Sequence, residues 1–457
     1  MSAVAGGRRS PSGGATPARR CALRVLRRVS AEGAYADRAL GAEAERAGLD
    51  PRERALAERL AFGAVQRRAT LDHVVAACSD RALERIDAPL LDALRLGVLQ
   101  LLFLDGIPDR AAVEQTVELA REAAGQRASG FANAVMRRAA REARALLDAL
   151  DDSGARGAAV RHSHPRWIAE LWWDALGGAD ARSLLEHDNE PPEAALRVNE
   201  LSATRPEALR ALRRAGVVAR QAPWPEEALV LDGPIDLARS PLFLAGAVTP
   251  QSRASMLVAR VAGPRPGERV LDLCAAPGAK TTHLAALMEN RGALTAVERH
   301  PRRASALAAN CRRLGAGVVE VVTADARAAE VGEGYDRVVV DPPCSDLGTL
   351  AARPDARWRK SPEAIEGLRI LQGELLAAAA VRVAPGGTLV YSTCTISPAE
   401  NAQVVGGFLT ARADFTVDDL SLEWPALADH RAPRFLQTLP HRHGTAGFFV
   451  ARLRRAP

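Results

Sequence analysis

A regular alternation of strand-like and helix-like segments from about residue 251 to the C-terminus most restricts the fold of this 457-residue chain. The strand-like segments are rich in β-branched residues: RVLDL, ALTAVE, VVEVVTAD, YDRVVVD and TLVYST. Helical segments such as PRRASALAANCRRLG separate them. This order predicts a doubly wound, mostly parallel sheet, and residues 251–457 are therefore predicted to form an α/β domain.

The N-terminal part has helical periodicity without a strand signal, which predicts an all-α domain over residues 17–148. Asp50-Pro51 is a typical N-cap and first-turn pair. The segment PLLDALRLGVLQLLFLD is apolar nearly all round, as expected for a helix at the centre of a bundle. We expect a helix to start after Ser129–Gly130 and a domain boundary in the polar stretch 151–157.

Residues 158–250 predict a small α+β module, in which the strands AALRVN, GVVARQ and LFLAGAV accompany the helix PEALRALRRAG. Trp167, Trp172 and Trp173 have near-helical spacing, which favours core packing over a base-stacking platform. Residues 1–16 are rich in Arg and Ser and free of acids, so a disordered tail is favoured over a transit peptide.

Composition restricts the partners and the compartment. The net charge of +6 fits an acidic partner such as nucleic acid, although many soluble proteins are as basic. Lys280 and Lys360 are the only lysines among 61 basic residues. Six scattered cysteines without a CxxC pair predict a reducing, cytoplasmic setting and no metal site. No apolar run is long enough to span a bilayer, so we expect no membrane association.

A Gly/Ala/Pro turn after the RVLDL strand is a candidate ligand loop. It opens a helix, whose N-terminal amides attract ligands, but it matches neither the Walker spacing nor GxGxxG. Glu298, Asp325 and Asp341 end the next three strands, which suits a nucleoside cofactor that carries no phosphate. The predicted cofactor residues are Cys274, Ala275, Ala276, Pro277, Gly278, Ala279, Lys280, Glu298, Asp325 and Asp341.

Two cysteines, Cys344 in DPPCSDLGTL and Cys394 in YSTCTISPAEN, each follow a strand-like run. A thiolate suits attack on carbon 6 of a pyrimidine, which makes carbon 5 nucleophilic toward an electrophilic methyl group. We expect Lys280 to provide the cationic setting that ionises a thiol and a protonated Asp341 to activate the ring at N3. The residues themselves leave open which thiol attacks, and small buried cysteines are the structural alternative.

The motifs LDLCAAPGAKTTH, AVERH, TADAR, DPPCSDLGTL, RWRK, YSTCTISPAEN and LPHRHGTAGFF resemble the RNA (cytosine-C5) methyltransferases. The resemblance is to their bacterial 16S ribosomal RNA branch, of the RsmB (Sun/Fmu) type, and covers the C-terminal half. The helical half, with FANAVMRR at its end, is similar to the NusB-type RNA-binding domain of that branch. It implies an all-α NusB-like domain, a small α+β module and a Rossmann-like class I methyltransferase domain.

The resemblance also implies ligands and roles. Residues 274–280 would contact S-adenosylmethionine, Glu298 its ribose and Asp325 its adenine side, with Asp341 between cofactor and base. Cys394, the later cysteine, would be the nucleophile, and Cys344 would assist product release. The substrate implied is 16S ribosomal RNA, free or partly assembled, and no oligomer is indicated.

The sequence departs from the family pattern at three positions. The turn has Ala279 where glycine is usual, which should be tolerated unless that residue needs positive φ. His443 and Ala446 replace acidic residues, which casts doubt on a substrate role for those two positions.

Two alternatives remain open. One is the same chemistry on transfer RNA or another RNA. The other is a non-catalytic RNA-binding assembly or antitermination factor, suggested by the helical half; the intact Cys344, Cys394, Asp341 and Lys280 favour an enzyme.

Overall fold

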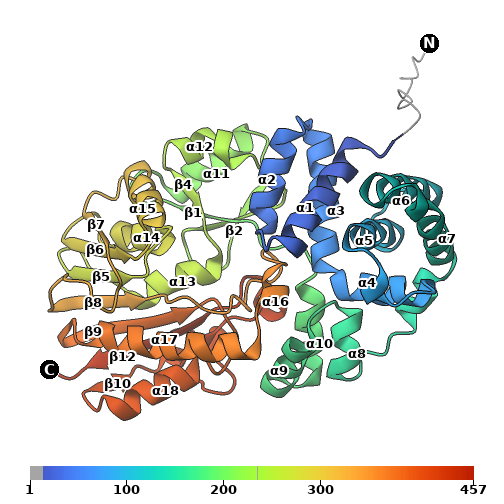
Figure 1. Cartoon of the computed structure of the whole chain (residues 1–457). Helices are drawn as coiled ribbons and strands as arrows, with labels where there is room; N and C mark the ends of the chain where they lie inside the picture. The colour runs from blue at the N-terminus through green and yellow to red at the C-terminus, as the bar shows by residue number, and fades with distance from the viewer. Residues whose placement is uncertain (1–13, 234) are drawn as a thin grey trace. The chain divides into compact units, whose positions relative to one another are not determined.

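The computed structural model describes residues 14–233 and 235–457, and the chain divides into two compact units (Figure 1). Unit 1 comprises residues 1–189 and 353–358, and unit 2 comprises residues 190–352 and 359–457. Residues 1–13, most of the predicted tail, lie outside the described residues. Thr16, also placed in that tail, is packed: its N–H donates to Gln115 over 2.8 Å.

Unit 1 is built of helices. The predicted N-cap is confirmed, because the Asp50 side chain accepts the Glu53 N–H at 2.8 Å and Pro51 opens the helix. The elements are α1 (Pro17–Ala31), α2 (Ala36–Arg46), α3 (Pro51–Gln66), α4 (Arg68–Cys78), η1 (Leu83–Arg85), α5 (Ala88–Phe103), α6 (Asp109–Ala124), α7 (Gln126–Asp148), α8 (Ala155–Arg161), α9 (Arg166–Leu176) and α10 (Gly178–His187).

Helix α5 lies at the centre of this bundle, as its apolar sequence predicts (Figure 1). Leu94 and Val98 on one side of the helix and Leu96 on the opposite side are all fully buried. Gly97 lets α5 approach α6 and α7 closely: a Cβ there would lie 2.5 Å from Thr116 Oγ1 and 2.6 Å from Met136 Sδ.

The helix start expected after Ser129–Gly130 is wrong. Helix α7 begins at Gln126 and continues through both residues. The chain turns one residue earlier, at Gly125, whose φ of 86° is accessible to glycine. Because Ala128 and Ala132 are buried against the bundle, packing offsets the low helix propensity of Gly130.

Unit 1 also contains two pieces outside the predicted all-α range. Helices α8–α10 follow the break after α7, and Trp172 is fully buried among them while Trp167 and Trp173 are half-buried. Residues 353–358 form the other piece, which includes most of the short helix α16 (Ala356–Arg359). The buried Arg357 guanidinium donates to the carbonyls of Ser163 and Asp188, both at 3.0 Å.

Unit 2 begins with a small α+β module whose four-stranded antiparallel sheet has the order β2-β3-β1-β4. The predicted LFLAGAV strand is wrong: Pro241 starts a helical turn and Gly246 has a φ of 71°, so the strand begins only at Val248. The elements are β1 (Ala195–Val198), α11 (Arg205–Arg214), β2 (Ala219–Gln221), β3 (Ala228–Leu231), η2 (Leu237–Arg239), α12 (Pro241–Leu244) and β4 (Val248–Pro250).

The remainder of unit 2 contains an eight-stranded sheet of order β10-β12-β9-β8-β5-β6-β7, with β11 paired to β12. Its strands are β5 (Arg269–Leu273), β6 (Ala293–Glu298), β7 (Val319–Thr323), β8 (Tyr335–Val340), β9 (Val383–Thr393), β10 (Phe415–Val417), β11 (Leu436–Gln437) and β12 (Phe449–Arg455). The helices are α13 (Arg253–Ala262), α14 (Ala279–Leu287), α15 (Pro301–Arg313), α17 (Pro362–Ala380), α18 (Ala402–Ala411), α19 (Pro440–His443), η3 (Leu420–Leu422) and η4 (Pro425–Leu427).

This sheet is doubly wound, as predicted. Strands β5 to β9 pair in parallel, and β12 pairs antiparallel with β9. Successive strand residues face opposite layers: Val339 packs in the core with α13, α14 and α15, whereas Val338 and Val340 pack in the core with α17 and α18. Because both faces are covered, the strands are apolar nearly throughout.

The close approach at Gly97 generates a stability prediction. Gly97→Ala is expected to lower the free energy of unfolding of unit 1 by about 1–3 kcal/mol, because the added methyl group overpacks the core. Gly130→Ala is the matched control: its Cβ would enter open space on α7, so helix stability should rise by up to about 1 kcal/mol. Urea unfolding followed by circular dichroism measures both changes. A neutral Gly97→Ala variant would contradict this packing.

Candidate active site

The carboxyl ends of the parallel strands bring the predicted site residues to one edge of the sheet. Leu273 of β5 pairs with Val297 of β6 on one side and with Val340 of β8 on the other. Val340 in turn pairs with Tyr391 of β9. The residues that follow these strands are therefore neighbours, as is usual for ligand sites in open α/β sheets.

The loop 274–278 after β5 is fixed from outside by helix α15. The Arg303 guanidinium donates to the Ala276 carbonyl at 2.8 Å, and the Asn310 amide donates to the Pro277 carbonyl at 2.9 Å. Gly278 has a φ of 102°, and a Cβ there would lie 2.6 Å from Leu307 Cδ1. Ala279 is the first residue of α14 and does not have positive φ. The backbone at this position therefore does not require the glycine that is usual in the family.

Two predicted carboxylates lie at the next strand ends. Glu298 ends β6 with only 3% of its surface exposed, and its Oε1 accepts the His300 N–H at 2.9 Å. Asp325 follows β7 and accepts the Arg327 guanidinium at 2.8 Å and the Arg327 N–H at 3.0 Å. These hydrogen bonds hold the pKa of Asp325 well below its usual range.

Lys280 and Asp341 form an ion pair between α14 and the end of β8. Lys280 Nζ lies 2.7 Å from Asp341 Oδ2, and the Ser392 hydroxyl donates to Asp341 Oδ1 at 3.0 Å. Burial would lower the pKa of Lys280, but the attraction of Asp341 outweighs it and the pKa is raised. Both Asp341 oxygens thus have a hydrogen-bond partner, and the predicted role of Asp341 at N3 of the base stays a prediction.

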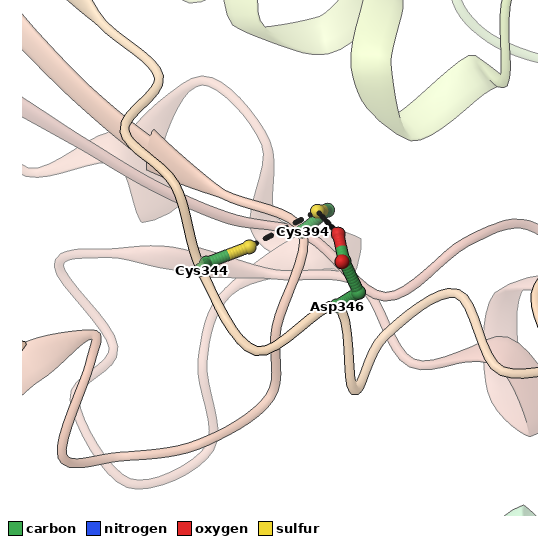
Figure 2. Close-up of side chains that lie close together, drawn as sticks. All are labelled: Cys344, Asp346 and Cys394. Carbon is green, nitrogen blue, oxygen red and sulfur yellow. Dashed lines mark hydrogen bonds between the residues drawn. The ribbon is translucent and has the colours of Figure 1, made fainter. Parts of the chain in front are cut away.

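The two cysteines meet at this edge, as Figure 2 shows. Cys344 Sγ and Cys394 Sγ lie 3.1 Å apart in a hydrogen bond in which either thiol can donate. When Cys344 is the donor in that bond, Cys394 donates its own thiol proton to Asp346 Oδ1 at 3.2 Å. Cys344 is buried with 7% exposure, whereas Cys394 is half-buried. The pair is thus a juxtaposed dithiol with one member partly open to solvent.

A buried carboxylate, Glu400, positions the two cysteine loops. Its Oε1 accepts the Ser345 N–H at 2.8 Å, and its Oε2 accepts the Ser345 hydroxyl at 2.6 Å. Gln372 donates to Oε1 at 3.1 Å, and the Tyr391 hydroxyl donates to the Glu400 carbonyl at 2.6 Å. Glu400, Asp346 and Ser392 were not predicted from the sequence, because single polar residues beside a strand end have no distinctive pattern.

The structure does not support the expectation that Lys280 ionises a thiol. The pKa of Cys394 is raised well above that of a free cysteine, first by the hydrogen bond with Cys344 and then by burial. The negative charges of Asp346 and Asp341 raise it further. Cys394 is therefore a thiol at neutral pH, and Lys280 is engaged with Asp341.

Cys344, Asp346 and Cys394 place three possible metal ligands within 4.8 Å of one another. Two thiols and a carboxylate form a donor set that zinc accepts. These atoms include both cysteines for which a reaction is predicted, so a metal bound there would block the nucleophile. The expectation of no resident metal stays a prediction.

His443 and Ala446, the other departures from the family pattern, have structural contacts. His443 Nδ1 accepts the Leu439 N–H at 2.8 Å, and the Ala446 carbonyl accepts the Thr438 hydroxyl at 2.7 Å.

Among the described residues, no helix is both long and apolar enough to cross a membrane.

A doubly wound sheet with a ligand loop after its first parallel strand, acids at the next strand ends and a pair of adjacent thiols is the arrangement of an α/β methyltransferase. Three family models match the chain: "16S rRNA methyltransferase RsmB/F" over residues 259–454, "NusB family" over 16–141 and "Methyltr_RsmF/B-like, ferredoxin-like domain" over 164–238. The chain belongs to the RsmB/F family of ribosomal RNA small-subunit methyltransferases.

Relatives match over nearly the whole chain. The "Probable ribosomal RNA small subunit methyltransferase B" of Bacillus subtilis is 35% identical over 96% of this chain and 99% of its own length. "Ribosomal RNA small subunit methyltransferase B" of Pseudomonas putida is 33% identical over 95% and 98%. The crystal structure of PH0851 superposes with a TM-score of 0.80 at 26% identity, covering 96% of this chain and 98% of that one.

The boundaries of the predicted domains remain predictions. The ferredoxin-like model spans residues 164–238, whereas compactness places α8–α10 in unit 1 and the four-stranded sheet in unit 2. The helical NusB-like part, the α+β module and the methyltransferase sheet themselves are confirmed.

The thiol pair generates a pKa prediction. Cys344→Ala is expected to lower the pKa of Cys394, because the hydrogen bond with Cys344 is the largest cause of its elevation. Alkylation of Cys394 by iodoacetamide at neutral pH should then be faster, since the thiolate is the reactive form. Peptide mass spectrometry measures the rate, and Cys311→Ala, a buried thiol of α15, is the control. An unchanged or slower alkylation would refute the assigned cause.

Proposed function

We propose that this enzyme methylates carbon 5 of a specific cytosine in 16S ribosomal RNA through a covalent bond between Cys394 and carbon 6 of the base. The observation that carries the proposal is the pair of thiols 3.1 Å apart at the sheet edge that also holds the Lys280–Asp341 ion pair. The family supports the coarser part, methylation of small-subunit ribosomal RNA.

S-adenosylmethionine is the methyl donor, and the strand ends fit it. The 274–278 loop leads into the N-terminus of α14, and Glu298 and Asp325 offer carboxylate oxygens, which accept from ribose hydroxyls and amino groups. Asp341 completes this set from β8. No guanidinium fork for a phosphate is needed, because this donor carries none. When bound, it supplies an electrophilic methyl group.

The protein's residues perform the remaining steps. Cys394 Sγ bonds to carbon 6 while the Lys280 ammonium, held by Asp341, donates a hydrogen bond or proton toward N3. Carbon 5, now enamine-like, takes the methyl group. A base then removes the carbon 5 proton, and the electron pair left on carbon 5 expels the Cys394 sulfur, which regenerates the ring.

The roles of the two thiols are assigned by resemblance, and burial is consistent with them. Cys394, the half-buried thiol, is placed to meet a base, whereas Cys344 is nearly enclosed beside it. We assign bond formation to Cys394 and product release to Cys344. The target cytosine lies in an unstacked loop or is extruded from its helix, since a stacked base hides carbon 6. Free or partly assembled small-subunit RNA would provide it.

Methyl transfer tests the function and the two roles. Cys394→Ala is expected to reduce methylation by at least about 10³-fold, because it removes the nucleophile. Cys344→Ala is expected to accumulate a denaturant-resistant RNA–protein adduct that Cys394→Ala does not form. Bisulfite mapping of total RNA and gel analysis of the adduct are the measurements. A mark on transfer RNA would reject the substrate, no mark on any RNA would reject the enzyme, and the reverse adduct pattern would exchange the roles.

Binding of S-adenosylmethionine tests the proposed role of the 274–278 loop. Gly278→Ala should weaken binding of S-adenosylmethionine about tenfold or more, because the strained φ and the contact with Leu307 displace the loop. Gly315→Ala is the control: it also places alanine at a positive φ, 67°, but its Cβ meets nothing within 4 Å and it lies after α15. Calorimetry measures both affinities. Equal affinity for Gly278→Ala and wild type would show that this loop does not hold the donor.

A further inference from the structure

The carboxylate of Asp346 lies beside the sulfur that is proposed to react. Cys394 donates its thiol proton to Asp346 Oδ1 over 3.2 Å, which is within the range of a nucleophile and its general base. Figure 2 shows Asp346 and Cys344 on different sides of the Cys394 sulfur. Asp346 was not among the predicted site residues, and the family match assigns it no role.

The reaction needs a base at this point. Cys394 is protonated at neutral pH, and only the thiolate attacks efficiently. Lys280 is a cation, and Asp341 already accepts hydrogen bonds from Lys280 and Ser392. Cys344 is another thiol, which has no advantage as a base over the thiol it would deprotonate. Asp346 is the carboxylate that receives the proton directly.

Backbone hydrogen bonds also fix the turn that carries Asp346 relative to the segment that carries Cys394. The Gly348 N–H, two residues after Asp346, donates to the Cys394 carbonyl at 3.0 Å. The Gly447 N–H donates to the Gly348 carbonyl at 2.7 Å, and a Cβ at Gly348 would lie 2.0 Å from the Gly447 carbonyl oxygen. This close packing fixes the Asp346 turn against the segment that carries Cys394, so the contact is preorganised.

We propose that Asp346 is the general base that accepts the Cys394 thiol proton as the sulfur bonds to carbon 6; this inference rests on the proposed function. The S–H bond breaks, its proton moves to Asp346 Oδ1, and its electron pair forms the S–C6 bond. When the product is released, the C6–S bond breaks and the protonated Asp346 returns the proton to the departing sulfur. No oxidant or further reactant is consumed.

A conformational role for this residue is distinguishable from a catalytic one. Asp346 has a φ of 61° in a turn whose carbonyl accepts the Thr349 N–H and hydroxyl, both at 2.9 Å. Glycine adopts such a φ without strain, and asparagine tolerates it while keeping the side-chain shape. Asp346→Gly and Asp346→Asn therefore preserve the turn and remove the base.

The experiment measures the rate of covalent adduct formation in the Cys344→Ala background, with saturating S-adenosylmethionine and excess 16S ribosomal RNA. Both Asp346→Asn and Asp346→Gly are expected to slow adduct formation about 10²-fold or more at neutral pH. The deficit should shrink as pH rises, because hydroxide then generates the thiolate. The affinity for S-adenosylmethionine should not change. Glu333→Gln, which removes a charge from an exposed turn of the same unit, should leave the rate unchanged.

The opposite results would overturn the proposal. The negative charge of Asp346 also raises the pKa of Cys394, so if that were its main effect, both variants would form the adduct faster at neutral pH. If Asp346 only shaped the turn, Asp346→Gly would keep the wild-type rate. Failure of the proposed function itself is separable, because the Cys344→Ala protein with Asp346 intact would then form no adduct at all.

Discussion

The parallel pairing of β8 with β9 is the interaction on which the site depends. Residues 344 and 394 are fifty positions apart, and the register of these two strands brings the loops that follow them together. Helices α17 and α18 cover one face of the pair, so the strands are fixed by burial as well as by hydrogen bonds. The Glu400 carboxylate then joins the two loops, and the thiols face each other as a result.

One cation and two carboxylates are arranged around the thiol pair. Asp341 pairs with Lys280, which in the proposed mechanism acts as an acid toward the base and does not stabilise a thiolate. The second carboxylate, Asp346, accepts a hydrogen bond from the Cys394 thiol. The proposed mechanism therefore separates a proton donor for the base, Lys280, from a proton acceptor for the sulfur, Asp346.

Much of this architecture could be predicted because its signals are periodic and local. The alternation of strands and helices after residue 251, the Asp50-Pro51 cap and the apolar α5 segment all depend on neighbours in sequence. The errors arose where tertiary packing outweighed a local signal. Gly130 lies inside α7 because its neighbours pack in the bundle, and LFLAGAV gives a helical turn because Pro241 and Gly246 delay the strand.

The sequence by itself determined the class of protein: a glycine turn, acids at successive strand ends and the motifs around them indicate an α/β methyltransferase whatever the details of packing. The two strand-end cysteines suggested the thiol chemistry that is proposed for it. Only the tertiary structure decided which groups touch. Hydrogen bonds between residues far apart in the chain pair Lys280 with Asp341 and Cys394 with Asp346. A pKa depends on burial and on such partners, which no local pattern encodes, and so the raised pKa of Cys394 became clear only in three dimensions.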